Sequence, residues 1–422
     1  MTLPDELTAD TRAVLRRARA ASRQMATATT AQKNEFLQAV VAHLQEAQGD
    51  LIGANAEDLS RAQQAGRNAA FVDRLRLDPQ RVRSIRQAVE QIIALPDPVG
   101  QISSGSVRPN GLEVQRVAIP LGVIGIVYES RPNVTIDAGC LCIKAGNAVV
   151  LRGGSDASKS NAVLLEVLRR ALKSAGLPSD AAQAPAVSGH QGIEALVSQA
   201  DGLDVIIPRG GKKLIDAVNR WARVPVIQHY EGVCHIYVDR AADLDDAEAI
   251  VVNAKAQRPG VCNAMEALLV DEAVADIAIP RMVSALRAVD VVVYGCERTQ
   301  ALVGEVAKAA PSDRGREFLD LACLVEVVDG LDGALAHIAD HGSGHTEAIL
   351  TKDYARSRLF TAAVDASCVM VNASTRFNDG GCLGLGAEIG ISTTKLHAYG
   401  PMGLEALTTK KYVVLGQGHV RD

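Results

Sequence analysis

Residues 257–264 read Gln257-Arg258-Pro259-Gly260-Val261-Cys262-Asn263-Ala264, a proline-glycine break that presents one cysteine between two regular segments. Before the break, apolar residues recur at helical spacing: Leu244, Ala247, Ile250, Val251 and Ala254. After it, the continuous apolar run 267–270 is typical of a short buried strand. A loop between two packed elements can hold a side chain at the mouth of a cleft. We interpret Cys262 as a nucleophile, although residue type alone favours a buried thiol, because free cysteines are among the most buried residues.

Helix and strand patterns also alternate on the N-terminal side of this stretch. Between residues 117 and 227, short β-branched runs alternate with helical patterns, which predicts a doubly wound parallel sheet. The expected strands are 122–127, 148–151, 184–187, 204–207 and 224–227. A helix is expected over 156–175, ended by Gly176-Leu177-Pro178. A second αβ block is expected over 234–390 and a final strand over 411–415.

The first hundred residues predict helices. Thr29-x-x-Gln32 resembles a capping box ahead of an apolar helical pattern, and a second helix is expected from Pro79 to Leu95. Between residues 107 and 114 the period changes to two, with Asn110-Gly111 between the alternating segments, which is a strong hairpin signal. A hairpin exposes strand edges, so we expect this one to pair with another subunit.

Composition narrows the classes of function. The chain has 422 residues, and 48% of them are hydrophobic. A single core usually holds fewer hydrophobic residues than this, so we expect two or more domains. The net charge is -5, and the sequence has no long run of charged residues of one sign. We therefore expect a small-molecule ligand rather than a nucleic acid or a membrane. The eight cysteines are scattered and the N-terminus lacks a signal-peptide pattern, which favours reduced thiols in the cytoplasm.

Two glycine loops leave expected strands and enter helices. One is Arg152-Gly153-Gly154-Ser155 and the other is Arg209-Gly210-Gly211. Backbone N–H groups and the helix dipole at such junctions favour anions. A tight turn explains either loop alone, but two in one sheet, each with a basic residue, favour a nucleotide site. The usual G-x-G-x-x-G fingerprint is missing from both.

Segments across nearly the whole chain resemble the aldehyde dehydrogenase superfamily. They are 119–126, Arg131-Pro132-Asn133, 145–152, 260–264 and Glu317-Phe318-Leu319. The resemblance implies an α/β fold with a Rossmann-like doubly wound cofactor domain, an α/β catalytic domain and a small β oligomerisation hairpin. It implies that Cys262 is the catalytic nucleophile and that Asn133 polarises the reacting carbonyl. It also implies that Arg152 and Glu317 bind the cofactor, and the two glycine loops add Gly153, Gly154, Ser155, Arg209, Gly210 and Gly211 as expected cofactor-binding residues.

Four more segments are similar to one branch of that superfamily, which reduces L-glutamyl 5-phosphate to L-glutamate 5-semialdehyde in proline biosynthesis. They are 128–135, 371–377, 384–392 and 400–404. This resemblance implies an NADPH-dependent homo-oligomeric enzyme that forms a cysteine thioester without a metal. Association with glutamate 5-kinase, which makes the acyl phosphate, is left open.

The same resemblance divides the chain into parts. We expect a cofactor-binding domain from 1–101 and 119–230, a catalytic domain from 231–395, and an oligomerisation element from 102–118 and 396–422.

Departures from the superfamily pattern refine these expectations. His229 stands where hydrolytic relatives have the glutamate that activates water, so a hydrolytic reaction is not expected. Ser155 stands where NAD-using relatives often have a carboxylate, which favours NADPH. Arg131 and Arg376 are candidates for binding the anionic groups of the substrate, with structural ion pairs as the alternative. Lys395 and His397 are further candidates.

Other functions stay open at this point. A CoA-acylating aldehyde dehydrogenase also forms a thioester and needs no hydrolytic base. A non-catalytic protein could retain the fold, although the set of Asn133, Cys262 and Glu317 argues against it. A cysteine hydrolase is a third alternative, but no His and Asn or Asp pair is identifiable as its triad.

Overall fold

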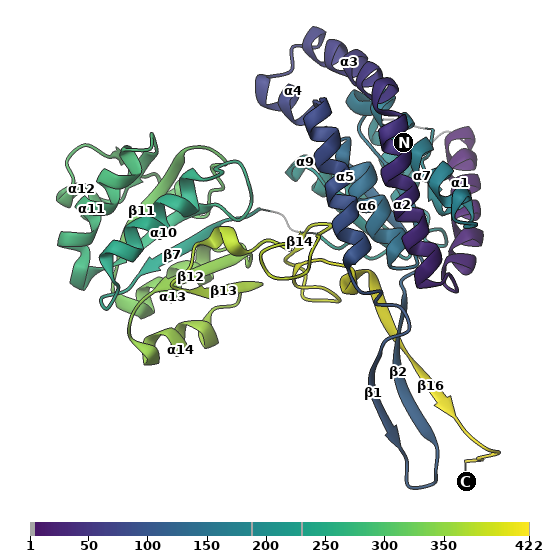
Figure 1. Cartoon of the computed structure of the whole chain (residues 1–422). Helices are drawn as coiled ribbons and strands as arrows, with labels where there is room; N and C mark the ends of the chain where they lie inside the picture. The colour runs from purple at the N-terminus through teal and green to yellow at the C-terminus, as the bar shows by residue number, and fades with distance from the viewer. Residues whose placement is uncertain (1–4, 187–188, 229–230, 422) are drawn as a thin grey trace. The chain divides into compact units, whose positions relative to one another are not determined.

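The computed structural model of the chain describes residues 5–186, 189–228 and 231–421 (Figure 1). It divides into two compact units. Unit 1 comprises Met1–Gln228, Leu385–Gly390 and Met402–Asp422, and unit 2 comprises His229–Gly384 and Ile391–Pro401. Unit 2 is therefore inserted, in sequence, between parts of unit 1.

Unit 1 begins with helices. They are α1 (Asp5–Met25), α2 (Thr30–Glu46), α3 (Gln48–Gln64), α4 (Ala69–Leu75) and α5 (Pro79–Ala94). The capping box at Thr29 and Gln32 is confirmed, and α2 buries Phe36, Leu37, Val40 and Leu44. The helix expected from Pro79 is confirmed as α5, which begins with Pro79 and ends before Leu95.

A parallel sheet with the order β5-β4-β3-β6 forms the centre of unit 1. Its strands are β3 (Val123–Tyr128), β4 (Ala148–Arg152), β5 (Ala182–Gln183) and β6 (Val205–Arg209). The associated helices are α6 (Asn133–Lys144), η1 (Ser155–Ala157), α7 (Ser158–Ser174), η2 (Ser179–Ala181), α8 (Gly189–Val197) and α9 (Lys212–Trp221). The doubly wound parallel arrangement expected from the sequence is confirmed.

Two expected strands of this sheet were wrong in detail. The strand placed at 184–187 is instead β5, at Ala182–Gln183, and Val187 lies outside the described residues. The strand placed at 224–227 is reduced to one bridge between Val226 and Ile206. Proline explains both, because Pro185 and Pro225 lack the N–H group that a continuing ladder needs.

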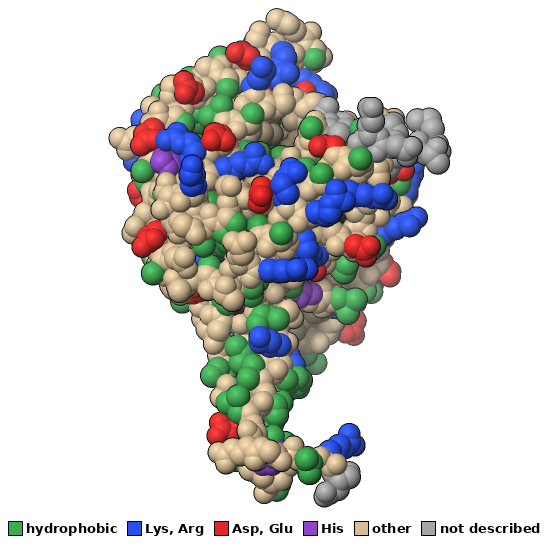
Figure 2. Space-filling view, turned by 90° about the vertical axis from the view of Figure 1, so that its right-hand side faces the viewer, with side chains coloured by type: hydrophobic (Ala, Val, Ile, Leu, Met, Phe, Trp, Pro, Cys, Tyr) green, Lys and Arg blue, Asp and Glu red, His purple; other side chains and the backbone are tan. Residues whose placement is uncertain are grey.

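The expected hairpin is confirmed and is completed by the C-terminal strand. β1 (Ile102–Val107), β2 (Glu113–Pro120) and β16 (Thr408–Leu415) form an antiparallel sheet in the order β1-β2-β16. Gly111 occupies the turn with φ +90°, a conformation that favours glycine. Figure 2 shows hydrophobic side chains along this sheet. Those most exposed are Ile102, Val107, Tyr412, Val414 and Leu415.

Unit 2 is built on a second parallel sheet, in the order β10-β9-β11-β8-β7-β12-β13. The strands are β7 (Cys234–Val238), β8 (Met265–Asp271), β9 (Val292–Gly295), β10 (Ala307–Lys308), β11 (Ala322–Val328), β12 (Thr346–Leu350) and β13 (Cys368–Val371). The helices are α10 (Leu244–Ala256), η3 (Glu272–Val274), α11 (Ala275–Arg287), α12 (Glu297–Leu302), η4 (Pro311–Asp313), α13 (Gly330–His341), α14 (Tyr354–Ala363) and η5 (Thr375–Phe377). The helix and strand expected on either side of Cys262 are confirmed as α10 and β8.

Short elements complete the chain. β14 (Ile391–Ser392) pairs with β15 (Gly400–Pro401) in unit 2, and η6 (Glu405–Leu407) precedes β16 in unit 1.

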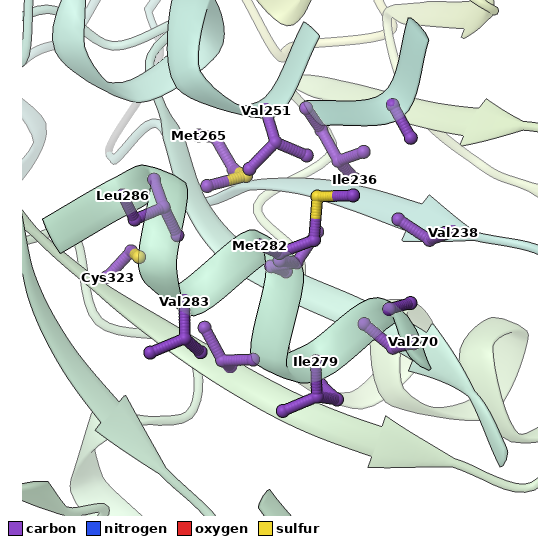
Figure 3. Close-up of a cluster of buried hydrophobic side chains, with 14 of the residues drawn as sticks. Ile236, Val238, Val251, Met265, Val270, Ile279, Met282, Val283, Leu286 and Cys323 are labelled. Carbon is purple, nitrogen blue, oxygen red and sulfur yellow. The ribbon is translucent and has the colours of Figure 1, made fainter. Parts of the chain in front are cut away.

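The core of unit 2 anchors the strand that follows the cysteine. Side chains from β7, β8, α10 and α11 meet in one buried cluster that includes Ile236, Val251, Met265 and Met282 (Figure 3). Burying side chains of this size stabilises by about 1.5–3 kcal/mol each. The turn at 257–264 is therefore attached to rigid elements at both ends.

Among the described residues, every helix is too short or too polar to span a bilayer.

Candidate active site

Three loops meet at the carboxyl edge of the sheet in unit 1. They connect β3 to α6, β4 to α7 and β6 to α9, and the strands are parallel, so all three loops leave the same edge. The backbone N–H of Glu129 donates to the carbonyl of Arg209 at 3.3 Å. A Cβ placed on Gly154 would lie 3.7 Å from the Cα of Glu129. The structure thus brings Asn133 and both glycine loops to one edge of unit 1.

Asn133 is the first residue of α6, and its amide is held by a carboxylate one turn later. The Nδ2 of Asn133 donates to the Oδ2 of Asp137 at 2.8 Å. Burial raises the pKa of Asp137 to about 6, although the hydrogen bond from Asn133 and the charge of Arg209 act to lower it. The sequence analysis missed Asp137. The signal was present, because residues four apart lie on the same face of a helix.

The glycine loop after β4 fits an anionic or hydroxyl-bearing ligand. Arg152 is 5% exposed, its Nη2 donates to the carbonyl of Gly189 at 2.5 Å, and its Nε has no partner among the described residues. Burial lowers the pKa of Arg152. A Cβ on Gly153 would meet the ring of Tyr128 at 3.0 Å, so glycine lets the backbone of this loop approach the strand closely. An unused buried donor beside an exposed Ser155 is compatible with the ribose and phosphates of a dinucleotide.

The loop after β6 leads into α9, whose N-terminal residues include Lys212. Gly211 precedes the first helical residue, and its backbone N–H donates to the Oε2 of Glu129 at 3.4 Å. A Cβ on Gly210 would lie 2.6 Å from the Cδ2 of Leu214 and 2.8 Å from the same carboxylate oxygen. Arg209, Gly210 and Gly211 are thus packed tightly against the loop that follows β3.

In unit 2, Cys262 lies on the turn between α10 and β8 and is partly exposed, which contradicts the buried-thiol alternative. Its backbone is held from two sides. The Sγ of Cys234 donates to the carbonyl oxygen of Cys262 at 3.1 Å, and a Cβ on Gly232 would lie 2.6 Å from the Cα of Cys262. The next residue, Asn263, donates through Nδ2 to the carbonyl of Asn378 at 2.9 Å. These contacts fix the backbone of the turn, and Cys262 itself is partly exposed.

Glu317 reaches the same turn through Gly232. Its Oε1 accepts the backbone N–H of Gly232 at 2.9 Å, and burial raises the pKa of Glu317. Beneath it, Lys255 and Glu266 form a fully buried ion pair at 2.7 Å. The Oε1 of Glu266 also accepts the backbone N–H of Leu319 at 3.4 Å, which ties the loop carrying Glu317 to β8. The structure therefore brings Cys262 and Glu317 together.

Arg376 lies beside the cysteine turn. Its Nε donates to the Oε1 of Gln257 at 2.9 Å. Burial lowers the pKa of Arg376, and the charge of Arg258 acts in the same direction. The positive charges of Arg376 and Arg258 at the cysteine turn favour the binding of an anionic ligand.

The remaining candidates divide into separate groups. Arg131 lies in unit 1, in the loop before α6. Lys395 is in an exposed ion pair with Asp365 at 2.5 Å, which accounts for its charge. His397 has a positive φ of 78° in the segment between β14 and β15. His229 lies outside the described residues.

The fold and the partly exposed cysteine define a class of enzyme. Residues 1–323 match the model of the aldehyde dehydrogenase family, so the chain belongs to that family of oxidoreductases, whose members use a nicotinamide cofactor. Gamma-glutamyl phosphate reductase of Solidesulfovibrio magneticus is 55% identical over 98% of this chain and 99% of its own length. The crystal structure of gamma-glutamyl phosphate reductase from Thermotoga maritima is 42% identical, covers 98% of this chain and 100% of its own, and superposes with a TM-score of 0.96. Within the family, this chain belongs with the gamma-glutamyl phosphate reductases.

A more distant structure bears on the CoA-acylating alternative. An acetylating aldehyde dehydrogenase from Geobacillus thermoglucosidasius covers 99% of this chain and 98% of its own, with a TM-score of 0.69 and 18% identity. At that identity the likeness shows the fold alone.

Proposed function

We propose that the chain catalyses the NADPH-dependent reduction of L-glutamyl 5-phosphate to L-glutamate 5-semialdehyde and phosphate, the second step of proline biosynthesis from glutamate. The observation that carries the proposal is the partly exposed Cys262 on a turn held by Gly232 and Cys234, in a chain 55% identical to a reductase of that name. The CoA-acylating alternative is less supported, because it rests on the fold alone.

The first step is the attack of the Cys262 thiolate on the C5 carbonyl of the acyl phosphate. A thiolate suits this role because it is a strong nucleophile and also a good leaving group. The Asn133 amide and the backbone N–H of Cys262 are the donors proposed for the oxyanion. Collapse of the tetrahedral intermediate breaks the C–O bond, releases phosphate and leaves a thioester on Cys262.

The second half of the reaction, which reduces the thioester on Cys262, needs a hydride, and a nicotinamide cofactor would supply it when bound. Cys262 then leaves as thiolate, and the aldehyde is released. We propose that Glu317 holds the nicotinamide ribose and that Arg152–Ser155 and Arg209–Gly211 hold the rest of the dinucleotide. The anionic groups of the substrate are assigned to Arg131 and Arg376.

NADPH is proposed over NADH because of the charge around residue 155. Ser155 has no carboxylate to repel a 2′-phosphate. The neighbouring carboxylate of Asp156 is engaged by Arg67, with Nη2 and Oδ1 3.3 Å apart. A guanidinium in this place can bind a phosphate.

The proposal keeps the division into parts expected from the sequence. Residues 1–101 and 119–230 bind cofactor, residues 231–395 carry the nucleophile, and residues 102–118 and 396–422 join subunits. The exposed apolar side chains of β1 and β16 support a homo-oligomer, most simply a dimer, which light scattering would measure. A cytoplasmic location and association with glutamate 5-kinase also belong to the proposal, the latter because an acyl phosphate is unstable in water. Co-elution of the two purified proteins tests that association.

The deciding experiment is the reverse reaction, in which glutamate 5-semialdehyde reduces NADP in a phosphate-dependent manner. NAD and CoA replace NADP and phosphate in parallel reactions. The proposal expects the highest rate with NADP and phosphate together. A rate that depends on CoA but not on phosphate would contradict it, and equal rates with NAD would contradict the cofactor assignment.

A further inference from the structure

The catalytic face of α6 carries a second polar residue beside the amide. In α6, which the structure describes throughout, Asn133 and Asp137 are the two residues that are not buried, and all the others are. They lie one turn apart and are joined by the 2.8 Å hydrogen bond from Asn133 to Asp137. The accessible part of this helix therefore presents an amide and a carboxylate next to each other.

The carboxylate of Asp137 can accept hydrogen bonds beyond the one from Asn133. Its Oδ2 accepts from Asn133, and Asp137 forms no ion pair with any residue that the structure describes. The charge of Arg209, on β6, acts to lower the pKa of Asp137, but the two side chains are too far apart for an ion pair. The other titratable group that faces it is the buried thiol of Cys140, on the next turn of α6. A half-buried carboxylate without a cation is costly, and such groups concentrate at sites where a ligand supplies the missing charge.

We propose that Asp137 binds the α-ammonium group of the amino-acid substrate and so selects for aldehydes and acyl phosphates that carry it. The inference rests on the proposed function, which places the reacting carbonyl at Asn133. A short aliphatic chain separates the carbonyl of this substrate from its ammonium group, so neighbouring side chains on one helical turn can take one group each. The contact is a charge-assisted hydrogen bond, which is stronger than a neutral one.

A simpler role competes with this one, in which Asp137 does no more than orient the amide of Asn133. Asp137→Asn separates the two. The new amide oxygen still accepts a hydrogen bond from Asn133, but the negative charge is gone. The test compares this variant with the wild type on glutamate 5-semialdehyde and on 5-oxopentanoate, the same aldehyde without the amino group. Because the semialdehyde cyclises in solution, the quantity compared is the ratio of variant to wild type on each substrate.

The proposal expects Asp137→Asn to raise KM for glutamate 5-semialdehyde by roughly 10- to 100-fold, the usual worth of a hydrogen bond to a charged group, with kcat changed little. On 5-oxopentanoate, KM and kcat should stay within about 3-fold of wild type. Equal losses on both substrates would overturn the proposal in favour of the orienting role. No loss on either would overturn both roles.

Two controls complete the design. Asp216→Asn removes an exposed carboxylate from α9 and should change neither substrate's kinetics. If Asp137→Asn fails to fold, the wild-type enzyme still decides once kcat/KM for the semialdehyde is expressed per concentration of its open-chain form, because equal values for the two aldehydes would then exclude recognition of the ammonium group. Failure of the proposed function is a separate outcome, in which the wild type turns over neither aldehyde with phosphate and NADP.

Discussion

The two groups assigned to the reacting carbonyl are held in different ways. Cys262 is held through its backbone, by the Cys234 thiol and the close approach of Gly232, and the residue is partly exposed. Asn133 has the opposite arrangement, because its backbone begins a buried helix and its amide depends on one side-chain partner, Asp137. A nucleophilic cysteine needs a fixed backbone position and a sulfur atom that the substrate can reach. An oxyanion donor needs an N–H group with a fixed orientation. The predictions below test this difference, from the largest expected effect to the smallest.

Cys262→Ser should remove the reaction, because a serine hydroxyl at this site is a poorer nucleophile and a poorer leaving group than a thiolate. We expect kcat to fall by several orders of magnitude, with normal folding and cofactor binding. Steady-state rates and fluorescence titration of NADPH measure these quantities. The matched control is Cys382→Ser, which changes an exposed cysteine and should leave kcat unaltered. Near-normal turnover by Cys262→Ser would remove this thiol from the chemistry.

Asn133→Ala removes one proposed oxyanion donor. Losing such a donor typically costs about 3 to 4 kcal/mol in the barrier, so kcat should fall by roughly 10²- to 10³-fold. KM should change less, since the oxyanion exists in the transition state. Alkylation of Cys262 by iodoacetamide should continue at the wild-type rate, because the thiol is held independently of the amide. A proportional loss of alkylation would contradict the separate support of the two groups.

Gly232→Ala tests the backbone support of the cysteine turn. The added methyl group would collide with the backbone of Cys262, and overpacking of this kind costs typically about 1–3 kcal/mol. We expect a lower Tm and a several-fold change in the alkylation rate of Cys262. Gly304→Ala is the control, because a Cβ there meets nothing within 4 Å. If both variants have the same Tm and alkylation rate, the turn has more freedom than the structure gives it.

The smallest effect concerns pH and Asp137. Burial raises the pKa of this carboxyl to about 6, so it is charged above that pH and becomes protonated as the pH falls through it. Binding of an ammonium group should therefore weaken below about pH 6, which is measured as a rise in KM for glutamate 5-semialdehyde. The stability of the fold changes with pH in the opposite direction. Because the folded state keeps a proton that the unfolded state loses, the free energy of unfolding increases as the pH falls below about 6. Asp137→Asn should flatten this part of both profiles, and an unchanged KM profile would exclude Asp137 as its source.

Local signals in the sequence predicted much of the fold. The capping box at Thr29 and the Asn110-Gly111 turn each determine conformation within a few residues, so the corresponding helix and hairpin are confirmed. The strands near Pro185 and Pro225 failed because hydrophobic pattern outweighed the missing N–H groups in the prediction.

The site was less accessible to sequence reasoning. Spacing alone cannot place Glu317 against Gly232, since these residues meet through packing of distant segments. The assignment of Glu317 came from resemblance to a family. Asp137 carried a readable signal, its position four residues after Asn133, but no motif drew attention to it. The burial of Arg152 against Gly189 likewise depends on tertiary contacts.

The insertion of unit 2 within unit 1 also sets an order for biosynthesis. Asn147, the residue before β4, donates to the carbonyl of Leu407, 260 residues later, and β2 acquires β16 from the end of the chain. Closing such long loops is entropically slow. Unit 2 can therefore complete its seven-stranded sheet on the ribosome while β1 and β2 still await β16, and during that interval the unpaired edge of β2 is open to aggregation.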